Sequence, residues 1–157
     1  MIDSIINSIT DVCFIENIDV DRKVLHKSLL SHLESLLLRK GFDVHLEEPI
    51  FFNYLRIRDG SIYSKKGFID LMAIKDKTIL GIEFDSGNSL KNKSVEKLLQ
   101  STCNICIGIV RGNLIYTDEH NTLRIRENIS KGQFSNKMFW LINLSQKTIN
   151  IVEHDCA

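Results

Sequence analysis

The most regular hydrophobic pattern in the chain is helical and covers residues 21–40. Leucines recur there at steps of three and four residues, which places them on one stripe of a helix. They are Leu25, Leu29, Leu33, Leu36 and Leu37. Asp21 can cap the start of this helix and Gly41 can end it. Residues 2–15 alternate more loosely between apolar and polar types, and we expect a short helix there.

Two continuous apolar runs, residues 68–74 and 79–84, are separated by four polar residues. Runs of this length predict buried strands, and the short separation predicts an antiparallel hairpin. We expect further strands at 42–46, 50–57 and 105–110, a turn at 59–60, a helix at 93–101, and a C-terminal hairpin of 138–144 with 148–152. Residues 113–117 and 123–126 are also expected to be β structure.

Each of the two apolar runs contains a carboxylate, Asp70 in the first and Glu83 in the second. An ionised carboxylate in a buried strand is costly unless a partner compensates it. If the hairpin turn is centred on Asp76 and Lys77, paired residue numbers sum to 153, and Asp70 lies opposite Glu83 on one face. Asp85, two residues beyond Glu83, points to the same face.

Two explanations of this pair remain open. Each acid could form a salt bridge with its own basic residue, which would be a structural arrangement. Alternatively, both could share a hard cation, as metal-dependent phosphodiester cleavage requires. The second explanation depends on the two carboxylates converging without each being neutralised by its own basic partner.

The order of helix, strand, Gly-Phe-Ile-Asp70, turn, Ile-Glu83-Phe-Asp85, helix and strand resembles the PD-(D/E)XK nuclease superfamily. The resemblance covers roughly residues 21–111 and implies a restriction-endonuclease-like αβββαβ core, with a central mixed sheet flanked by helices. It implies that Asp70, Glu83 and the backbone carbonyl of Phe84 hold Mg²⁺ or Mn²⁺. An assisting carboxylate would be Glu34, at the edge of the leucine stripe, or Glu47, at the end of the first strand.

The chain departs from this family at Asp85, because the family has a lysine two residues after the glutamate. Asp85 could join the metal shell or act as a base, or the site could be inactive. A lysine from the helix that starts near residue 93 could also replace the missing one, with Lys97 favoured over Lys93. Gln100 could face the same site.

Nucleic acid would need basic groups near Asp70. Arg56, Arg58, Lys65 and Lys66 flank the approach to Asp70, with Tyr54 and Tyr63 among them, and Lys93 opens the next helix. This mixture suits a loop that contacts the phosphate backbone, although a solvated hairpin has the same composition.

Composition changes this picture little. Twenty basic and twenty acidic residues cancel, so attraction to nucleic acid must come from local patches. Cys103 and Cys106 form a close pair without further ligands at metal-binding spacing, and we expect thiols in the core. The five histidines have no ligand spacing, and serine-hydrolase and nucleotide-binding motifs do not occur. No apolar run approaches the ~20 residues that a membrane span needs, so we expect a cytoplasmic protein.

Together these patterns predict one α/β domain over residues 1–157, with its core at about 21–111 and a β-rich extension at 112–157. The predicted function is divalent-metal-dependent hydrolysis of phosphodiester bonds, with DNA favoured as the substrate of an endonuclease. The sequence leaves open whether the substrate is duplex, branched or single-stranded; a homodimer would most simply cut both strands of a duplex. The alternative is a catalytically inactive nuclease-fold subunit that binds DNA or serves in assembly. An unrelated α/β interaction protein is a third possibility.

Overall fold

The computed structural model describes residues 2–55, 59–112, 118–132, 134 and 136–152. The predicted strand at 113–117 and the candidate DNA contacts Arg56 and Arg58 lie outside these residues.

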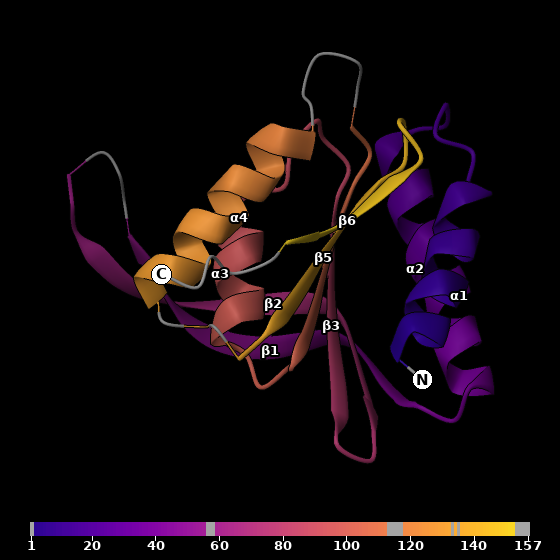
Figure 1. Cartoon of the computed structure of the whole chain (residues 1–157), viewed down its shortest axis with the longest axis horizontal. Helices are drawn as coiled ribbons and strands as arrows, with labels where there is room; N and C mark the ends of the chain where they lie inside the picture. The colour runs from indigo at the N-terminus through magenta and orange to yellow at the C-terminus, as the bar shows by residue number, and fades with distance from the viewer. Residues whose placement is uncertain (1, 56–58, 113–117, 133, 135, 153–157) are drawn as a thin grey trace.

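Within the described part of the chain, one mixed sheet of six strands lies between two pairs of helices (Figure 1). The strands are β1 (Asp43–Leu55), β2 (Ile62–Lys75), β3 (Thr78–Asp85), β4 (Ile105–Val110), β5 (Met138–Asn143) and β6 (Thr148–Val152), in that spatial order. β3, β4 and β5 are parallel, and the other neighbours are antiparallel. The predicted α+β fold class and the C-terminal hairpin are therefore confirmed.

The helices are α1 (Ile2–Phe14), α2 (Arg22–Arg39), α3 (Asn92–Gln100) and α4 (Asp118–Gly132). α1 and α2 cover one face of the sheet, and α3 and α4 cover the other (Figure 1). The leucine stripe of α2 is buried as predicted, the Asp21 side chain accepts a hydrogen bond from the Lys23 N–H, and Gly41 adopts a φ of 87° just after the helix.

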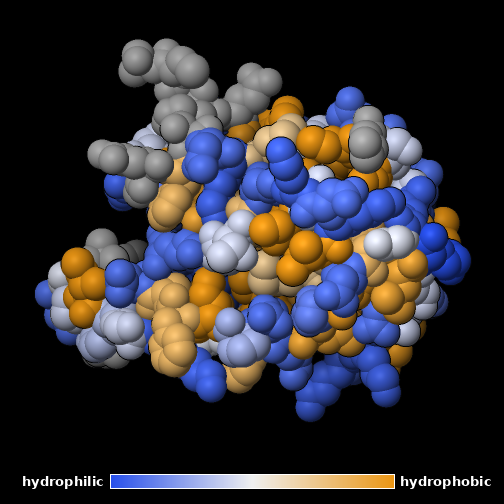
Figure 2. Space-filling view, turned by 90° about the horizontal axis from the view of Figure 1, so that it is seen from below, coloured by the Kyte–Doolittle hydropathy of each residue, from blue (hydrophilic) through white to orange (hydrophobic). Residues whose placement is uncertain are grey.

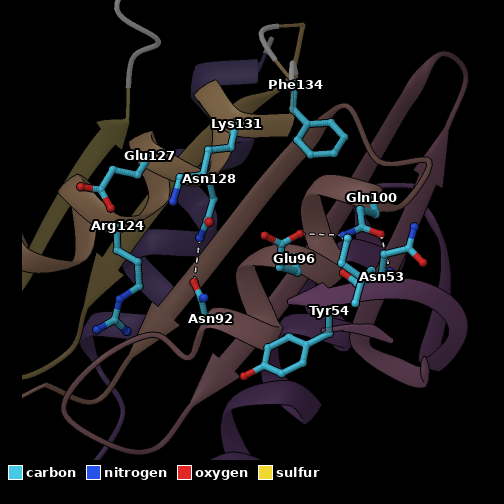
Figure 3. A pocket seen from close by; sticks show the side chains of 11 residues that line it. Asn53, Tyr54, Asn92, Glu96, Gln100, Arg124, Glu127, Asn128, Lys131 and Phe134 are labelled. Carbon is cyan, nitrogen blue, oxygen red and sulfur yellow. Dashed lines mark hydrogen bonds between the residues drawn. The ribbon is translucent and has the colours of Figure 1, made fainter. Parts of the chain in front are cut away.

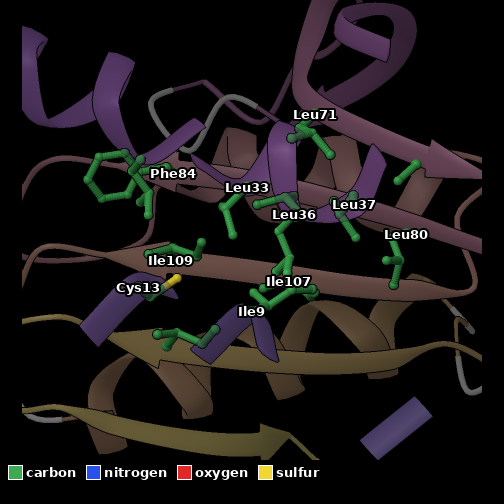
Figure 4. Packing of buried hydrophobic residues seen from close by; sticks show 14 of the residues in the cluster. Ile9, Cys13, Leu33, Leu36, Leu37, Leu71, Leu80, Phe84, Ile107 and Ile109 are labelled. Carbon is green, nitrogen blue, oxygen red and sulfur yellow. The ribbon is translucent and has the colours of Figure 1, made fainter. Parts of the chain in front are cut away.

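Apolar side chains form a layer on each face of the sheet. Ile9, Leu33 and Leu37 pack onto Ile107 and Ile109 beneath α1 and α2 (Figure 4). On the opposite face, Cys103 and Cys106 are buried free thiols whose Sγ atoms lie 3.4 Å apart, as expected for core cysteines. None of the helices in the described ranges is both long and apolar enough to cross a membrane.

Two sequence predictions of secondary structure were wrong. Residues 123–126 belong to α4 and not to a strand, because Asn121, Ile125 and Ile129 form its buried face at helical spacing while Leu123 is exposed. The predicted strands at 42–46 and 50–57 are one continuous strand, β1, which passes through Pro49. Pro49 is tolerated because β1 is an edge strand of the sheet.

β1 and β2 continue beyond the rest of the sheet as a long two-stranded arm. Figure 2 shows this arm projecting from the body, with separate apolar groups among hydrophilic side chains. Phe51, Ile62 and Phe68 are the large apolar residues of the arm that remain exposed. The arm returns over α3, which contacts both of its strands.

Candidate functional site

The candidate site lies where β2 and β3 separate. Their ladder runs from Lys75 opposite Thr78 to Leu71 opposite Ile82, and every pair sums to 153, as predicted. β2 then leaves with β1 to form the arm, whereas β3 continues along β4 to Asp85. Asp70 and Glu83, the next pair in this register, therefore lie at the fork between the strands.

At this fork the side chain of Asp70 takes the place of a backbone hydrogen-bond partner for β3. The backbone N–H of Phe84 donates a hydrogen bond of 2.8 Å to Oδ2 of Asp70. Since the N–H and C=O of a strand residue point to the same side, the Phe84 carbonyl also faces the fork. Asp70 and Glu83 thus meet at the fork, and the Phe84 carbonyl is directed toward it.

The two carboxyl groups lie within hydrogen-bond reach of each other. Glu83 is only 2% exposed, and burial together with the charge of Asp70 raises the pKa of Glu83 to about 9. Burial also pushes the pKa of Asp70 upward, but hydrogen bonds from His26 and from the Phe84 N–H outweigh it and hold that pKa below its usual value. The pair therefore holds negative charge at Asp70 and favours a proton on Glu83.

Lys97 of α3 reaches the pair from one side of the sheet. Its Nζ lies 2.5 Å from Oε1 of Glu83 and donates a 2.8 Å hydrogen bond to the carbonyl of Phe68. Gly67 makes this approach possible, because a Cβ there would lie 3.2 Å from Cδ of Lys97 and 2.9 Å from Cε1 of Phe52. The lysine favoured from the sequence is thus at the carboxylates.

His26 of α2 reaches the pair from the opposite side. Its Nε2 lies 3.5 Å from Oδ2 of Asp70, and its ring stacks on Phe84 with centroids 5.5 Å apart. The hydrogen bond with Asp70 raises the pKa of His26 against the effect of burial, and the charges of Asp70, Asp85 and Glu47 add to the rise. Sequence reasoning assigned His26 no role.

The assisting carboxylate from α2 is not at the fork. Glu34 lies eight residues after His26, about 12 Å further along the helix axis, and it makes no contact with Asp70 or Glu83 in the described structure. Glu47, the competing candidate, lies opposite Asp70 in the β1–β2 register, where every pair sums to 117. Its φ of 50° is a strained backbone conformation next to the site.

Asp85, which lies near Asp70 and Glu83, also has a structural role. It is 8% exposed, and its Oδ2 accepts a 2.7 Å hydrogen bond from the backbone N–H of Lys91, the residue before α3. This bond ties the end of β3 to the start of the helix that carries Lys97. Asp85 makes no direct contact with Asp70 or Glu83 among the described residues.

Basic groups collect on the side of the arm that faces α3. Lys65 lies against Lys93, and the close approach of the two basic groups lowers the pKa of Lys65. Lys93 also sits over the ring of Tyr54, at 5.2 Å from its centroid. Lys66, in contrast, lies over the ring of Phe68, at 5.7 Å from its centroid. Two like charges held together at a surface favour a bound anion.

Gln100 does not face the carboxylates. Its Oε1 accepts from the backbone N–H of Asn53, at 2.8 Å, and its Nε2 donates to the Asn53 carbonyl, at 2.9 Å, and to Glu96. It therefore fastens the arm to α3.

The donor set at the fork fits a hard cation that keeps much of its water. No group of three or more His, Cys, Asp or Glu side chains in the described ranges is placed to hold a metal ion. Mg²⁺, however, is commonly held by one or two carboxylates, with water and substrate phosphate completing its shell. Asp70, Glu83 and the Phe84 carbonyl supply this kind of incomplete oxygen site.

Comparisons with known proteins do not identify a family. No family model matches the chain, and no curated protein matches its sequence. Among solved structures, the crystal structure of SSO0001 superposes with a TM-score of 0.40 at 14% identity, over 86% of this chain and 51% of the other. This chain thus spans about half the length of that structure, and a similarity of this size carries no argument about fold or function.

Proposed function

We propose that this chain is a divalent-metal-dependent nuclease of the PD-(D/E)XK type that hydrolyses phosphodiester bonds in DNA as an endonuclease. The observation that supports it most is the convergence of Asp70 and Glu83 at a strand fork, with the Lys97 ammonium 2.5 Å from Glu83. Glu83 is buried and Asp70 partly buried, and two carboxyl groups brought together in such surroundings are costly for folding unless they are compensated.

Asp70, Glu83 and the Phe84 carbonyl would hold Mg²⁺ or Mn²⁺. When bound, such a cation lowers the pKa of a water molecule and stabilises charge on a phosphate oxygen. Lys97 would orient the attacking water or balance charge on the phosphate, which replaces the lysine absent at position 85. His26 would hold Asp70 in place through their contact, and Asp85 and Glu47 are further carboxylates whose charges act on His26.

The charges at the fork agree with a role in cation binding. Lys97 lowers the pKa of Glu83, yet burial and Asp70 still keep that pKa at about 9. A divalent cation bound by both carboxyl groups would favour the ionised form of Glu83 and release its proton.

The arm supplies groups suited to the DNA backbone. Lys65 of the arm and Lys93 of α3 form an exposed cationic pair. Lys97 lies on the same helix as Lys93. We assign them to phosphate contacts, which position a strand without reading its sequence. We extend the proposal to a homodimer, since β1 is an edge strand without a second neighbour among the described residues, and the arm exposes Phe51 and Phe68. Light scattering with DNA present tests this part.

A second candidate is an inactive nuclease-fold protein that binds DNA or serves in assembly. It is favoured by a specific observation, because each acid already has a basic neighbour: Asp70 has His26, and Glu83 has Lys97. The hydrogen bond from the Lys91 N–H to Asp85 also occupies the residue at the family's lysine position.

The experiment is a cleavage assay on supercoiled plasmid, branched DNA and single strands, with Mg²⁺ or Mn²⁺. We expect metal-dependent cleavage that Glu83→Gln lowers by about 10³-fold, since the cation supplies several kcal/mol of transition-state stabilisation. Asp76→Asn, in the exposed turn of the same hairpin, is the matched control and should leave cleavage unchanged. DNA binding without cleavage by the parent protein would favour the inactive subunit.

A further inference from the structure

A pocket lined by both polar and apolar side chains lies beside the candidate site, on the other flank of α3. It has a volume of about 650 Å³ and is enclosed by the β1–β2 arm, α3, α4 and Phe134 (Figure 3). This volume is within the usual range of about 300–1,000 Å³ for small-ligand pockets.

Four carboxamide side chains line the pocket, alongside four charged ones. Asn92 and Asn128 come from α3 and α4, and Nδ2 of Asn128 donates to Oδ1 of Asn92 at 2.7 Å. That bond leaves Oδ1 of Asn128 as an acceptor and Nδ2 of Asn92 as a donor, and neither has a partner among the described residues. The Asn53 side chain is likewise unpaired within the described ranges, since Gln100 uses only its backbone. Adjacent donors and acceptors of this kind match the edge of a nucleobase.

Two aromatic rings stand at opposite ends of the pocket, Tyr54 from β1 and Phe134 after α4 (Figure 3). Charged groups also line it. The two basic residues, Arg124 and Lys131, equal in number the two acidic ones, Glu96 and Glu127, so the formal charges cancel. A balanced pocket does not favour a phosphate. Aromatic faces with carboxamides between them instead favour a flat, uncharged, polar ring.

The pocket and the carboxylate site share α3. Asn92, Glu96 and Gln100 follow one row of this helix at steps of four, and Lys93 and Lys97 follow the next row, about 100° further round. A strand whose phosphate lies against Lys93 therefore has the pocket immediately beside it. Tyr54 connects the two regions, because Lys93 lies over its ring while the same residue lines the pocket.

We propose that this pocket receives an unpaired nucleobase of the nucleic-acid substrate, stacked on Phe134 or Tyr54 and hydrogen-bonded to Asn128 and Asn92. The inference rests on the proposed nuclease function and sharpens it. A base inside a duplex is stacked and paired, so it cannot enter without being flipped out. The substrate class is therefore nucleic acid with a single-stranded or unpaired position next to the cleaved bond.

The test uses the unaltered protein in metal-free buffer, with a short single-stranded oligonucleotide that contains 2-aminopurine. We expect binding to quench the probe's fluorescence, and the same strand annealed into a perfect duplex to give little quenching. Stacking of one base on an aromatic ring corresponds to about 5- to 150-fold in affinity. Phe134→Ala should weaken single-strand binding by that factor.

Three further variants distinguish a loss of base binding in the pocket from misfolding and from a loss of phosphate contacts. Phe134→Leu keeps an apolar side chain and should still lose quenching, and Asn128→Leu should weaken binding without changing its salt dependence. Leu123→Ala removes an apolar side chain from α4, the helix that carries Asn128, at a position 53% exposed and outside the pocket lining, and should bind like the parent.

Parent-like quenching and affinity in both Phe134→Leu and Asn128→Leu would overturn the pocket assignment, as would equal quenching with the perfect duplex. Failure of the proposed function has a different signature, namely retained base binding by a parent protein that never cleaves with Mg²⁺ or Mn²⁺. Cleavage by the parent that Phe134→Ala leaves unchanged on every substrate would overturn this inference alone.

Discussion

β4 and the end of β3 are neighbouring parallel strands that bury opposite kinds of chemistry. All six residues of β4 are buried and none is polar, whereas β3 ends in Glu83 and Asp85, which are 2% and 8% exposed. Burying an apolar side chain stabilises a fold, while burying a carboxylate destabilises it unless a partner compensates. β4 can thus be understood from folding alone, and the end of β3 cannot. Local conflicts with folding rules of this kind mark functional sites.

The largest expected effect is the pH dependence of stability in metal-free protein. Glu83 has a pKa of about 9 when folded and an ordinary value of 4.5. Between these values the folded protein keeps a proton that the unfolded chain has released, so the free energy of unfolding falls as pH rises from 4.5 to 9. The slope for one group is at most about 1.4 kcal/mol per pH unit.

Urea unfolding at several pH values measures this slope, and Glu83→Gln should remove it and stabilise the metal-free protein at neutral pH. The difference between parent and variant reports Glu83 together with the change that its loss causes at Asp70, because the two groups titrate as a coupled pair. A parent curve parallel to that of Glu83→Gln would mean that Lys97 fully neutralises Glu83, and the contrast with β4 would be lost.

Shortening a buried side chain in β4 should lower the stability of the fold and leave the candidate metal site unaffected. Ile107→Ala leaves a cavity in a strand with 0% exposure at that residue and should reduce the free energy of unfolding by about 2–5 kcal/mol. Metal affinity per folded molecule should be unchanged. Denaturant unfolding and calorimetry on the same sample check both quantities, and a large loss of metal affinity would show that the two strands are not separable.

Replacement of Lys97 tests the fork without changing a carboxylate. Lys97→Met keeps the aliphatic length and should lower the cleavage rate at saturating DNA by about 10²-fold. Lys93→Met, one turn earlier on α3, should instead weaken DNA binding and reduce its salt slope by about one unit. If the two variants behave alike, Lys97 is only another phosphate contact.

The smallest predicted effect concerns the passage of Lys97 beside Gly67. Gly67→Ala places a Cβ close to Lys97 and Phe52, so the lysine must shift, and we expect about a 10-fold slower cleavage. Gly87→Ala is the matched control because a Cβ there meets nothing within 4 Å. Cleavage by Gly67→Ala at the parent's rate would show that the position of Lys97 is not critical.

The convergence of Asp70 and Glu83 could be predicted because it depends on local information. Two apolar runs joined by a short turn fix a register, and register decides which side chains share a face. Lys97 could be proposed for a similar reason, since α3 follows β3 directly and returns over the same sheet end.

Contacts across separate layers could not be predicted from these patterns. His26 and Glu34 lie eight residues apart in one row of α2, and helical periodicity identifies that row without showing which turn meets Asp70. How far α2 is shifted along its axis relative to the sheet depends on tertiary packing. The pocket was missed because its residues come from the arm, α3 and α4, and 123–126 had been interpreted as a strand.

The most direct test of the central claim is calorimetric titration of the protein with Mn²⁺ in the absence of DNA. The account predicts binding that Asp70→Asn and Glu83→Gln each abolish and that Asp76→Asn leaves intact. Binding by the parent should also release a proton, because Glu83 must become a carboxylate to act as a ligand. No heat of binding from the parent, or equal binding by all three variants, would contradict a shared cation at the strand fork.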